Sequence, residues 1–378
     1  MPIGMSNQGS YTSLCGQKFK KIGDKEMKKL VNVLITGCLL TLVGCSSNSS
    51  TPAPKAEEPS DTTKNPQATA APTETKVMKL SVVTSKDRSL TQGLVKFGEI
   101  VEKETNGAIK AEVYPDGQLG GDLAVFDALK IGTIQGSTMS TGPIATSVET
   151  FNVFDLPFLF KDEATAYKVL DGPIGQELLD QLPAVGVIGL NYWENGFRHL
   201  TNNTREVKSV DDISGLKIRT LENNLHIDMW KELGATPTPI PYTELFTALE
   251  QRVVDGQENP AGNVTTAKFY EVQKYLTTTG HVYNASVFML SKKFWDSLTD
   301  EEKEIVKKAA AEAQTYQREL NQKESVEAID FLKKEGMVVT ELGAEEKQKF
   351  VEKLQPIYKK YAPTFGEDLV NKLLEANK

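Results

Sequence analysis

The sequence predicts an α/β fold in two lobes, with an open sheet that carries helices on both faces. Strand-like and helix-like runs alternate along the chain from residue 77 onward, which is the order of an open α/β sheet. Residues 77–378 are too many for one ordinary hydrophobic core and suit two lobes.

Residues 1–44 predict a secretory leader. Lys28 and Lys29 precede the apolar run "LVNVLITGCLLTLVG", which has the flanking charge of a signal sequence and is too short to span a membrane comfortably. The ending "LVGC" resembles a bacterial lipobox, so we expect Cys45 to be lipidated and to become the new N-terminus. The alternative is a chance cysteine after an apolar run. Because Met27 opens this leader properly, residues 1–26 could come from a misplaced start.

Residues 45–76 predict a lipidated, disordered tether. From Ser46 to Lys76 the chain is rich in Ser, Thr, Pro and Ala, and it has no aromatic or large aliphatic side chain with which to bury apolar surface. After cleavage before Cys45 the only remaining cysteine would be the lipidated one. A disulfide, a thiol nucleophile and a cysteine metal cluster are therefore not expected.

The charge of the mature chain limits its partners. Residues 1–44 carry six lysines and two acidic residues, so loss of the leader changes the formal net charge from −8 to −12. An acidic body argues against nucleic acid as a partner. Capture of an anion would therefore depend on a few well-placed cations.

The first half of the body alternates strands and helices. We expect strands at 79–84 and 108–115, helices at 90–105 and 120–131, and a buried strand at 186–193 that ends before the turn "ENG".

The second half continues this order and adds one long helix. We expect a strand at 216–220, helices at about 224–233 and 243–251, and a helix over 300–335, which contains no Gly or Pro. Thr299 and Glu302 form a capping box before that long helix, and Gly336 follows it. At 1.5 Å per residue it would span about 50 Å, so we expect it to brace both lobes.

The sequence offers little support for catalysis. It contains none of the common nucleophile-elbow, phosphate-loop or zinc-protease motifs, and "GQLGGD" (117–122) does not fit the dinucleotide fingerprint. His199, His226 and His281 lie in separate segments without a paired acid nearby, so we expect each of them to be structural. An exported α/β protein of this kind is expected to bind a ligand, without a cofactor or metal.

Two arginines are candidates for binding an anion. Arg219 lies at the end of the strand in "GLKIRT", and Arg198 follows the strand 186–193. Ligands of open α/β sheets bind beyond the carboxyl ends of the strands. Two guanidinium groups at that edge could meet one carboxylate. The alternative, from residue type alone, is a solvated surface arginine.

Several motifs resemble a known family. The runs "GLKIRTLENN", "ELFTALEQRVVDGQENP" and "FYEVQKYLTTTGHVY" look like the solute-binding subunits of tripartite ATP-independent periplasmic (TRAP) transporters of the DctP type. The runs "YPDGQLGGD", "FDLPFLF" and "NGFRHLT" fit the same pattern. The resemblance covers residues 77–378. Arg252 is a departure, because members often have Gly there, and it makes the turn after the helix 243–251 less certain.

The resemblance implies a carboxylate clamp. It assigns the clamping role to Arg219, contributing roles to Arg198 and to the amide of Asn259, and a lining role to Tyr242. Asn259 could instead be a turn residue before Pro260. Tyr242 could instead belong to the core.

The resemblance also implies residues around the rest of the ligand. Asp122 and Ser140 match positions that contact the distal part of the ligand in some members, and Trp193 matches an aromatic wall near the hinge. Trp193 could instead be core, and Asp122 could be an acid favoured by a helix N-terminus. With Glu222, the polar residues Asp122 and Ser140 favour a hydroxylated ligand, because acceptors suit hydroxyl donors.

The expected protein is a periplasmic-binding-protein-like trap with a hinge cleft. Lobe I is predicted over 77–196 plus 285–324 and lobe II over 197–284 plus 325–378. It would sit at the outer face of the cytoplasmic membrane or in the periplasm, capture a dicarboxylate, a hydroxy or keto acid or a sugar acid, and deliver it to a TRAP permease. A lipid-anchored sensor for the same acid is the alternative, and an exported hydrolase is the weakest one.

Overall fold

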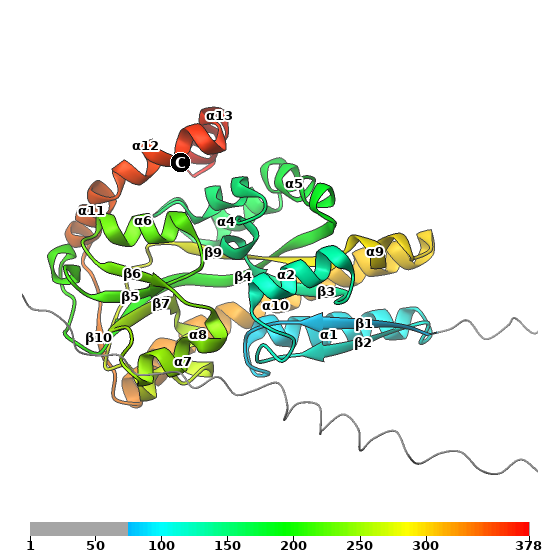
Figure 1. Ribbon diagram of the computed structural model, residues 1–378, viewed down its shortest axis with the longest axis horizontal. Coiled ribbons are helices and arrows are strands. Elements are labelled where there is room, and N and C mark those ends of the chain that lie inside the picture. Colours follow the sequence, from blue (N-terminus) through cyan, green and yellow to red (C-terminus); the bar gives the residue numbers. More distant parts are fainter. Residues whose placement is uncertain (1–74, 378) are drawn as a thin grey trace, which may run out of the picture. The chain divides into compact units, whose positions relative to one another are not determined.

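The computed structural model describes residues 75–377, which form an α/β body (Figure 1). The predicted leader, Cys45 and nearly all of the predicted tether lie outside the described residues. Within the described part, no helix combines the length and the apolar character that a membrane span requires.

The described strands form one mixed sheet of ten strands. Its main path runs β2-β1-β3-β9-β4-β7-β5-β6, and β8 joins it through β4 and carries β10. The bounds are β1 Lys76–Ser81, β2 Ile109–Tyr114, β3 Gly136–Ser140, β4 Val187–Asn202, β5 Lys217–Thr220, β6 Thr236–Pro239, β7 Gly256–Pro260, β8 Tyr275–Thr277, β9 Tyr283–Ser291 and β10 Val338–Thr340.

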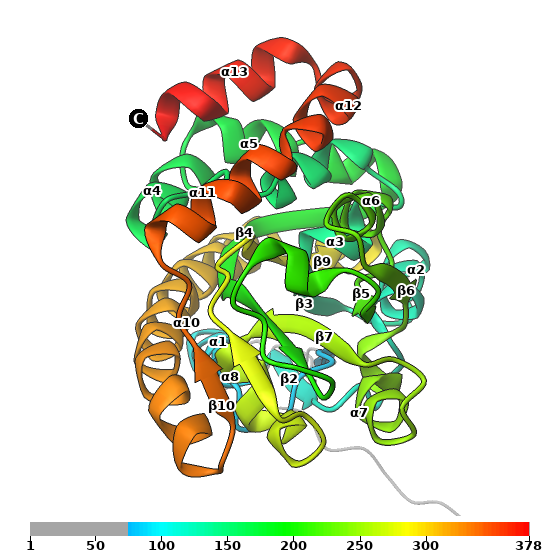
Figure 2. The ribbon, with the colours of Figure 1, turned by 90° about the vertical axis from the view of Figure 1, so that its left-hand side faces the viewer.

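Helices surround this sheet (Figures 1 and 2). The α-helices are α1 Ser89–Glu104, α2 Asp122–Ile131, α3 Thr141–Ile144, α4 Glu163–Leu170, α5 Pro173–Leu179, α6 Asn224–Glu232, α7 Tyr242–Glu250, α8 Ala261–Thr266, α9 Lys292–Asp296, α10 Asp300–Lys334, α11 Ala344–Lys353, α12 Gln355–Phe365 and α13 Glu367–Ala376. Short 3-10 helices are η1 Glu149–Asp155, η2 Leu182–Val185, η3 Val210–Ile213 and η4 Phe269–Glu271.

Strand β4 joins the two parts of the sheet. Its first part pairs antiparallel with β9, and its last residues pair with β7 and β8. The predicted end of this strand before "ENG" is therefore wrong. The chain accommodates this segment as an irregularity between Glu194 and Gly196, where Gly196 has a φ of 113°, and the strand then continues to Asn202.

The long helix α10 contacts both parts of the molecule. Its first half packs against α1 and its last turns pack against α8, and it also contacts β4 and β10 (Figure 2). Its start has the predicted capping box, in which Thr299 Oγ1 accepts from Glu302 N at 3.2 Å and Glu302 Oε2 accepts from Thr299 N at 2.7 Å. The predicted bracing helix is confirmed.

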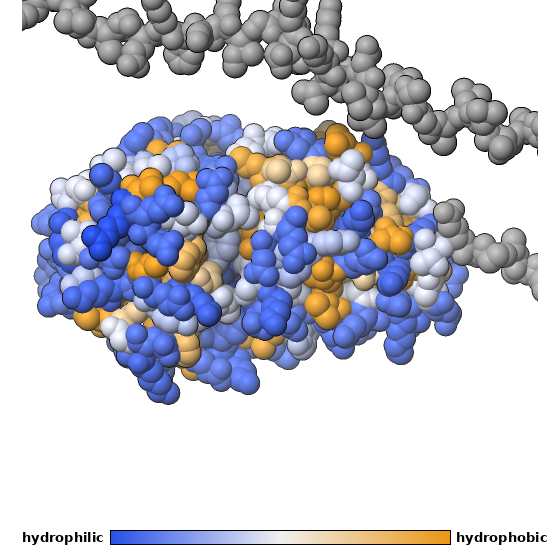
Figure 3. All heavy atoms as spheres, turned by 60° about the horizontal axis from the view of Figure 1, so that its bottom comes forward, coloured by the Kyte–Doolittle hydropathy of each residue, from blue (hydrophilic) through white to orange (hydrophobic). Residues whose placement is uncertain are grey.

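Local sequence signals predicted the bounds of most other elements to within a few residues. Helices α1, α2, α6 and α7 and strands β2 and β5 lie within two residues of their predicted bounds. Strand β1 begins and ends three residues earlier than predicted, because its pairing with β2 starts at Lys76 and Ile109. The surface in Figure 3 is largely hydrophilic, with apolar residues gathered in small patches.

Candidate functional site

Arg219 is buried in β5, so the surface alternative is wrong. Its side chain is 1% exposed, and its Nε donates to the carbonyl oxygen of Ile240 at 2.7 Å. Its Nη1 atom is buried without a hydrogen-bond partner among residues 75–377. Burial, with the positive charge of Arg198, lowers the pKa of Arg219 to about 10, so the group stays charged at neutral pH. A buried charged donor without a partner is a strong indication of an anionic ligand.

Arg198 lies inside β4, and the prediction that it stands at a strand end is wrong. Its guanidinium is held by Glu258, with contacts from Nε to Oε2 and from Nη2 to Oε1, the latter at 2.8 Å. Nη2 also donates to the Glu258 carbonyl oxygen, and Nη1 donates to Asn284 Oδ1 at 3.0 Å. Of the five donors of this group, one N–H on Nη1 is left for a ligand.

Glu258 neutralises the charge of Arg198, which the sequence did not predict. Burial raises the pKa of Glu258, but the charge of Arg198 and a hydrogen bond with His281 outweigh it, so the pKa lies below its ordinary value. His281 Nε2 lies 3.1 Å from Glu258 Oε2, and burial lowers the pKa of His281 despite that carboxylate. The uncompensated cation at this site is therefore Arg219.

The structure brings five of the predicted residues together around one small cavity of about 20 Å³. These residues are Arg198, Asn259, Tyr242, Asp122 and Ser140. The polar residues that the sequence did not predict are Thr84, Thr138, Asn195 and Asn263. The apolar part of the wall is Val82, Val83, Leu90, Met139 and Leu221.

Arg219 is electrostatically coupled to this wall. Burial raises the pKa of Asp122 to about 7, with Arg219 lowering it and Glu222 raising it. Burial also raises the pKa of Tyr242 to about 12, although the positive charges of Arg88, Arg219 and Arg198 each lower it. The charge of Arg219 thus acts on a carboxyl group and on a phenol in the cavity wall, and the phenol is protonated at neutral pH.

Hydrogen bonds orient the polar wall. Asn259 lies buried within β7, which rules out a turn role, and its Oδ1 accepts from Asn263 Nδ2 at 3.0 Å. Ser140 Oγ donates to Asn284 Oδ1 at 2.8 Å. Thr138 Oγ1 is buried and has no hydrogen-bond partner in the described part of the chain. Thr138 thus has an unused polar atom at this cavity.

Three predicted residues, Arg219, Trp193 and Glu222, are not among the residues that line this cavity. Trp193 lies in the core, where its ring is tilted by 34° against that of Phe288 with the centroids 4.8 Å apart. It packs so closely on Gly93 that a Cβ there would come within 2.7 Å of its ring. The predicted role of Trp193 as a cleft wall is therefore wrong. Glu222 is half-buried and lines a separate cavity of about 720 Å³, although its charge acts on Asp122.

Arg88 is a buried residue beside the site that the sequence analysis missed. It caps the start of α1, and its Nε donates to Asn263 Oδ1 at 2.7 Å while Nη2 donates to the Asn195 carbonyl oxygen at 2.7 Å. Nη1 contacts Asn321 of α10 at 2.5 Å and also Glu324. A single arginine thus fixes two cavity residues against the long helix. The only local feature of the sequence that could have pointed to Arg88 is its position soon after the first strand.

The chain belongs to the family of bacterial extracellular solute-binding proteins, family 7, named DctP, which residues 80–364 match. It is similar to the sugar acid binding protein of Advenella mimigardefordensis, whose structure contains galactonate. That match has 42% identity and a TM-score of 0.79, and it covers 80% of this chain and 98% of that one.

Two further relatives support the same family. A TRAP periplasmic solute-binding protein of Polaromonas sp. JS666, bound to D-erythronate, is 39% identical with a TM-score of 0.77 over 79% of this chain and 98% of that one. The C4-dicarboxylate-binding protein DctB of Bacillus subtilis is 36% identical over 306 residues, which are 80% of this chain and 87% of that protein. The predicted two-lobed α/β fold and the function as an extracytoplasmic solute-binding protein of a TRAP transporter are confirmed.

Proposed function

We propose that the protein captures a small organic acid by its carboxylate, with Arg219 as the central clamp. The observation that carries this proposal is the buried Nη1 of Arg219, which lacks a partner among the described residues. Arg198 and Asn259 line the small cavity, and the charge of Arg219 acts on Asp122 and Tyr242 in its wall. The remaining N–H of Arg198 and the amide of Asn259 would complete the clamp.

The ligand is proposed to be a hydroxylated acid of the sugar-acid type. Asp122, Ser140 and Thr138 line the cavity, and each has an oxygen that can accept a hydrogen bond from a ligand hydroxyl. Relatives bound to galactonate and to D-erythronate support this class. Succinate, found in a related structure from Sulfurospirillum deleyianum, offers a second carboxylate and would face Asp122.

Closure of the two lobes would enclose this ligand. By the predicted limits, Asp122 and Ser140 belong to lobe I, whereas Arg198, Arg219 and Asn259 belong to lobe II. A ligand that binds both sets favours the closed state. The closed protein would then deliver the acid to a TRAP permease, while a lipid on Cys45 and the tether over residues 45–76 would hold it at the membrane.

Binding without turnover is part of this proposal. Burial, the largest cause, lowers the pKa of His199 to about 3 and lowers that of His281, so both are poor candidates for a catalytic base that must hold a proton near pH 7. The transport role is preferred over a sensor role because the relatives reported above are named as binding proteins of TRAP or dicarboxylate type.

The clamp is tested by Arg219→Ala. The wild type is expected to gain a thermal shift with galactonate or D-erythronate, and the variant is expected to lose at least about 100-fold in affinity, because the charge-assisted bonds of the clamp are removed. Isothermal titration calorimetry measures the affinity. Arg252→Ala, which removes an exposed arginine, serves as the matched control and should bind normally. Unchanged binding by a folded Arg219→Ala protein would refute the clamp.

A further inference from the structure

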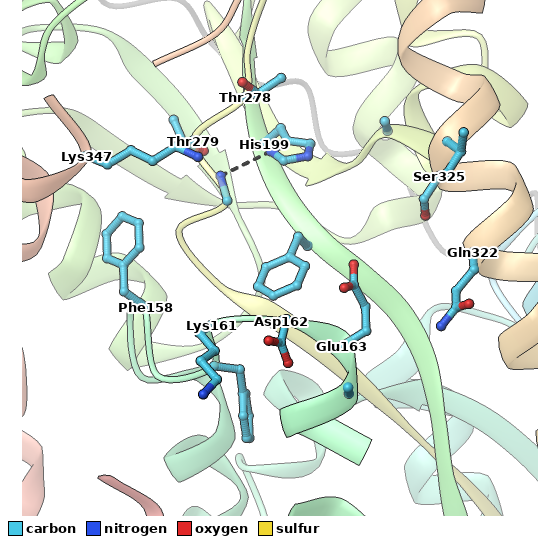
Figure 4. Close-up of a pocket in the computed structure, with 16 residues that line it drawn as sticks. Phe158, Lys161, Asp162, Glu163, His199, Thr278, Thr279, Gln322, Ser325 and Lys347 are labelled. Carbon is cyan, nitrogen blue, oxygen red and sulfur yellow. Dashed lines mark hydrogen bonds between the residues drawn. The ribbon is translucent and has the colours of Figure 1, made fainter. Parts of the chain in front are cut away.

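A second and much larger cavity lies on the other face of β4. It has a volume of about 950 Å³, and Phe197 and His199 line it, whereas Arg198 between them lines the small cavity described above (Figure 4). Successive side chains of a strand point to opposite faces, so one strand carries the clamp on one side and this cavity on the other.

Segments far apart in sequence form the walls of this cavity. They are the start of α4 with the loop before it, the loop at Thr278–Gly280, one face of α10 and Lys347 of α11. By the predicted limits, the α4 segment belongs to lobe I, and Thr278–Gly280 and Lys347 belong to lobe II. The cavity therefore spans the region where the lobes meet.

His199 presents a hydrogen-bond donor to this cavity. Its Nδ1 accepts from Gly280 N at 3.1 Å, so in the neutral ring the proton resides on Nε2. Burial lowers the pKa of His199 to about 3, and the positive charges of His281 and Lys347 act in the same direction, so the ring is neutral at pH 7. Among the described residues, none accepts a hydrogen bond from this Nε2.

The charges around the cavity are unevenly placed. Lys347 reaches toward Thr279 and His199 on one side in Figure 4, and Lys161, Asp162 and Glu163 lie on the other side. Asp162 is the cap of α4 and accepts from Thr165 N at 2.7 Å. A ligand anion is thus favoured near His199 and Lys347, whereas the far side carries charges of both signs.

Aromatic rings supply the apolar part of the wall. Phe160 and Phe197 each pack edge to face on Tyr283, with centroids 5.6 Å and 5.3 Å apart, and Phe158 lies nearby. Rings fixed in this way offer a preformed surface to a flat apolar group.

We propose that this cavity is a second binding site, which takes a small aromatic monocarboxylate. The carboxylate meets the Nε2–H of His199 and the ammonium of Lys347, and the ring lies against the phenylalanines. The site is separate from the carboxylate clamp at Arg219, and its ligand has an apolar ring where the proposed solute has hydroxyl groups.

The test is a fluorine NMR titration of para-fluorophenylacetate against the full body of the protein carrying Arg219→Ala. This background removes the clamp, so binding that remains reports on the second cavity. We expect saturable binding, and about tenfold weaker binding of the neutral amide, para-fluorophenylacetamide, because the charge-assisted contacts are lost.

Variants locate the site. Lys347→Gln should weaken binding about fivefold, the upper range for an exposed charge pair, and Lys349→Gln on the same helix outside the cavity should leave it unchanged. Ser325→Trp should fill the cavity and abolish binding. If that variant does not fold, Ala164→Phe fills the cavity from the exposed start of α4.

Three results would overturn the proposal. They are no binding of para-fluorophenylacetate, equal binding of acid and amide, and binding that neither Lys347→Gln nor the filling variants change. Each is distinct from failure of the clamp proposal, which is measured with sugar acids on the wild-type protein and does not involve Lys347.

Discussion

At the residue scale, the site depends on a difference in hydrogen bonding and charge pairing between Arg198 and Arg219. Glu258 satisfies most donors of Arg198 and cancels its charge, whereas Arg219 has a single bond to the Ile240 carbonyl oxygen. Two uncompensated guanidinium groups would repel each other and be expensive to bury. Pairing one of them leaves Arg219 as the guanidinium available to a carboxylate.

The protonation of Asp122 gives a pH-dependent prediction. Its pKa is about 7 in the folded protein and about 4 in an unfolded chain. Between these values the folded state holds the additional proton, so the stability that Asp122 contributes is present below about pH 4 and is lost as the pH rises through about 7. Asp122→Asn cannot ionise. Above pH 7 the variant should therefore be more stable than the wild type by about 1 kcal/mol, a discounted value because the side chain is only half-buried.

Urea denaturation at several pH values checks this prediction. The difference between the variant and the wild type should shrink toward about pH 4. Asp127→Asn on the same helix is the control, since Asp127 is exposed and pairs with Lys130 at 2.8 Å, and it should show no trend in this range. A difference for Asp122→Asn that does not vary with pH would contradict the assigned pKa.

At the element scale, β4 connects the two parts of the sheet and lines both cavities. It pairs with β9 in one part of the sheet and with β7 and β8 in the other, and it presents Arg198 to one face and His199 to the opposite face. Because side chains alternate with a period of two, a one-residue slip would exchange the residues facing the two cavities. The pairing with β9 and β7 prevents such a slip.

The end of α7 offers a test of backbone strain. Arg252 follows the helix with a φ of 58°, and Val253 N donates to the Ala248 carbonyl oxygen at 2.9 Å, so the expected turn forms in spite of the missing glycine. A non-glycine residue in this conformation costs about 1 kcal/mol. Arg252→Gly should raise the free energy of unfolding by roughly 0.5 to 1 kcal/mol, after the entropy of glycine is discounted.

Thermal or chemical denaturation measures this gain. Arg252→Ala keeps the strain and is the control, and it should leave stability within about 0.5 kcal/mol of the wild type. A loss of stability in Arg252→Gly would show that the arginine side chain, and not the backbone, matters here.

At the scale of the whole molecule, Arg88 joins parts that are distant in sequence. Its guanidinium bonds to Asn263 of α8, to Asn195 of β4 and to Asn321 of α10. By the predicted limits, Asn263 belongs to lobe II and the other partners to lobe I. With these limits, Arg88 would link the two predicted lobes next to the ligand cavity.

Arg88→Met should destabilise the protein strongly. The change keeps much of the volume but leaves Asn263 Oδ1 without its donor and Glu324 without its ion-pair partner, and we expect a loss of about 3 kcal/mol in urea denaturation. Arg205→Met is the matched control, because Arg205 is partly exposed and bonds to the carbonyl oxygens of Asp212 and Ser214. Equal losses in the two variants would argue against a special role for Arg88.

The sequence by itself determined the features that depend on neighbouring residues. The capping box at Thr299, the long helix behind it and the strand that carries Arg219 follow from local chemistry and periodicity. The motifs around Arg219 and Asn259 also led to the correct family, because they are contiguous runs.

Only the tertiary structure decided which polar groups meet. Arg198 is neutralised by Glu258, which lies 60 residues away, and Arg88 bonds to Asn321, which lies 233 residues away. Trp193 packs on Phe288 in the core, and β4 continues past "ENG" because β9 and β7 pair with it. Side-chain pairing and strand extension depend on residues that folding brings close together. Local propensity depends only on neighbouring residues in the sequence, so it cannot predict these distant partners.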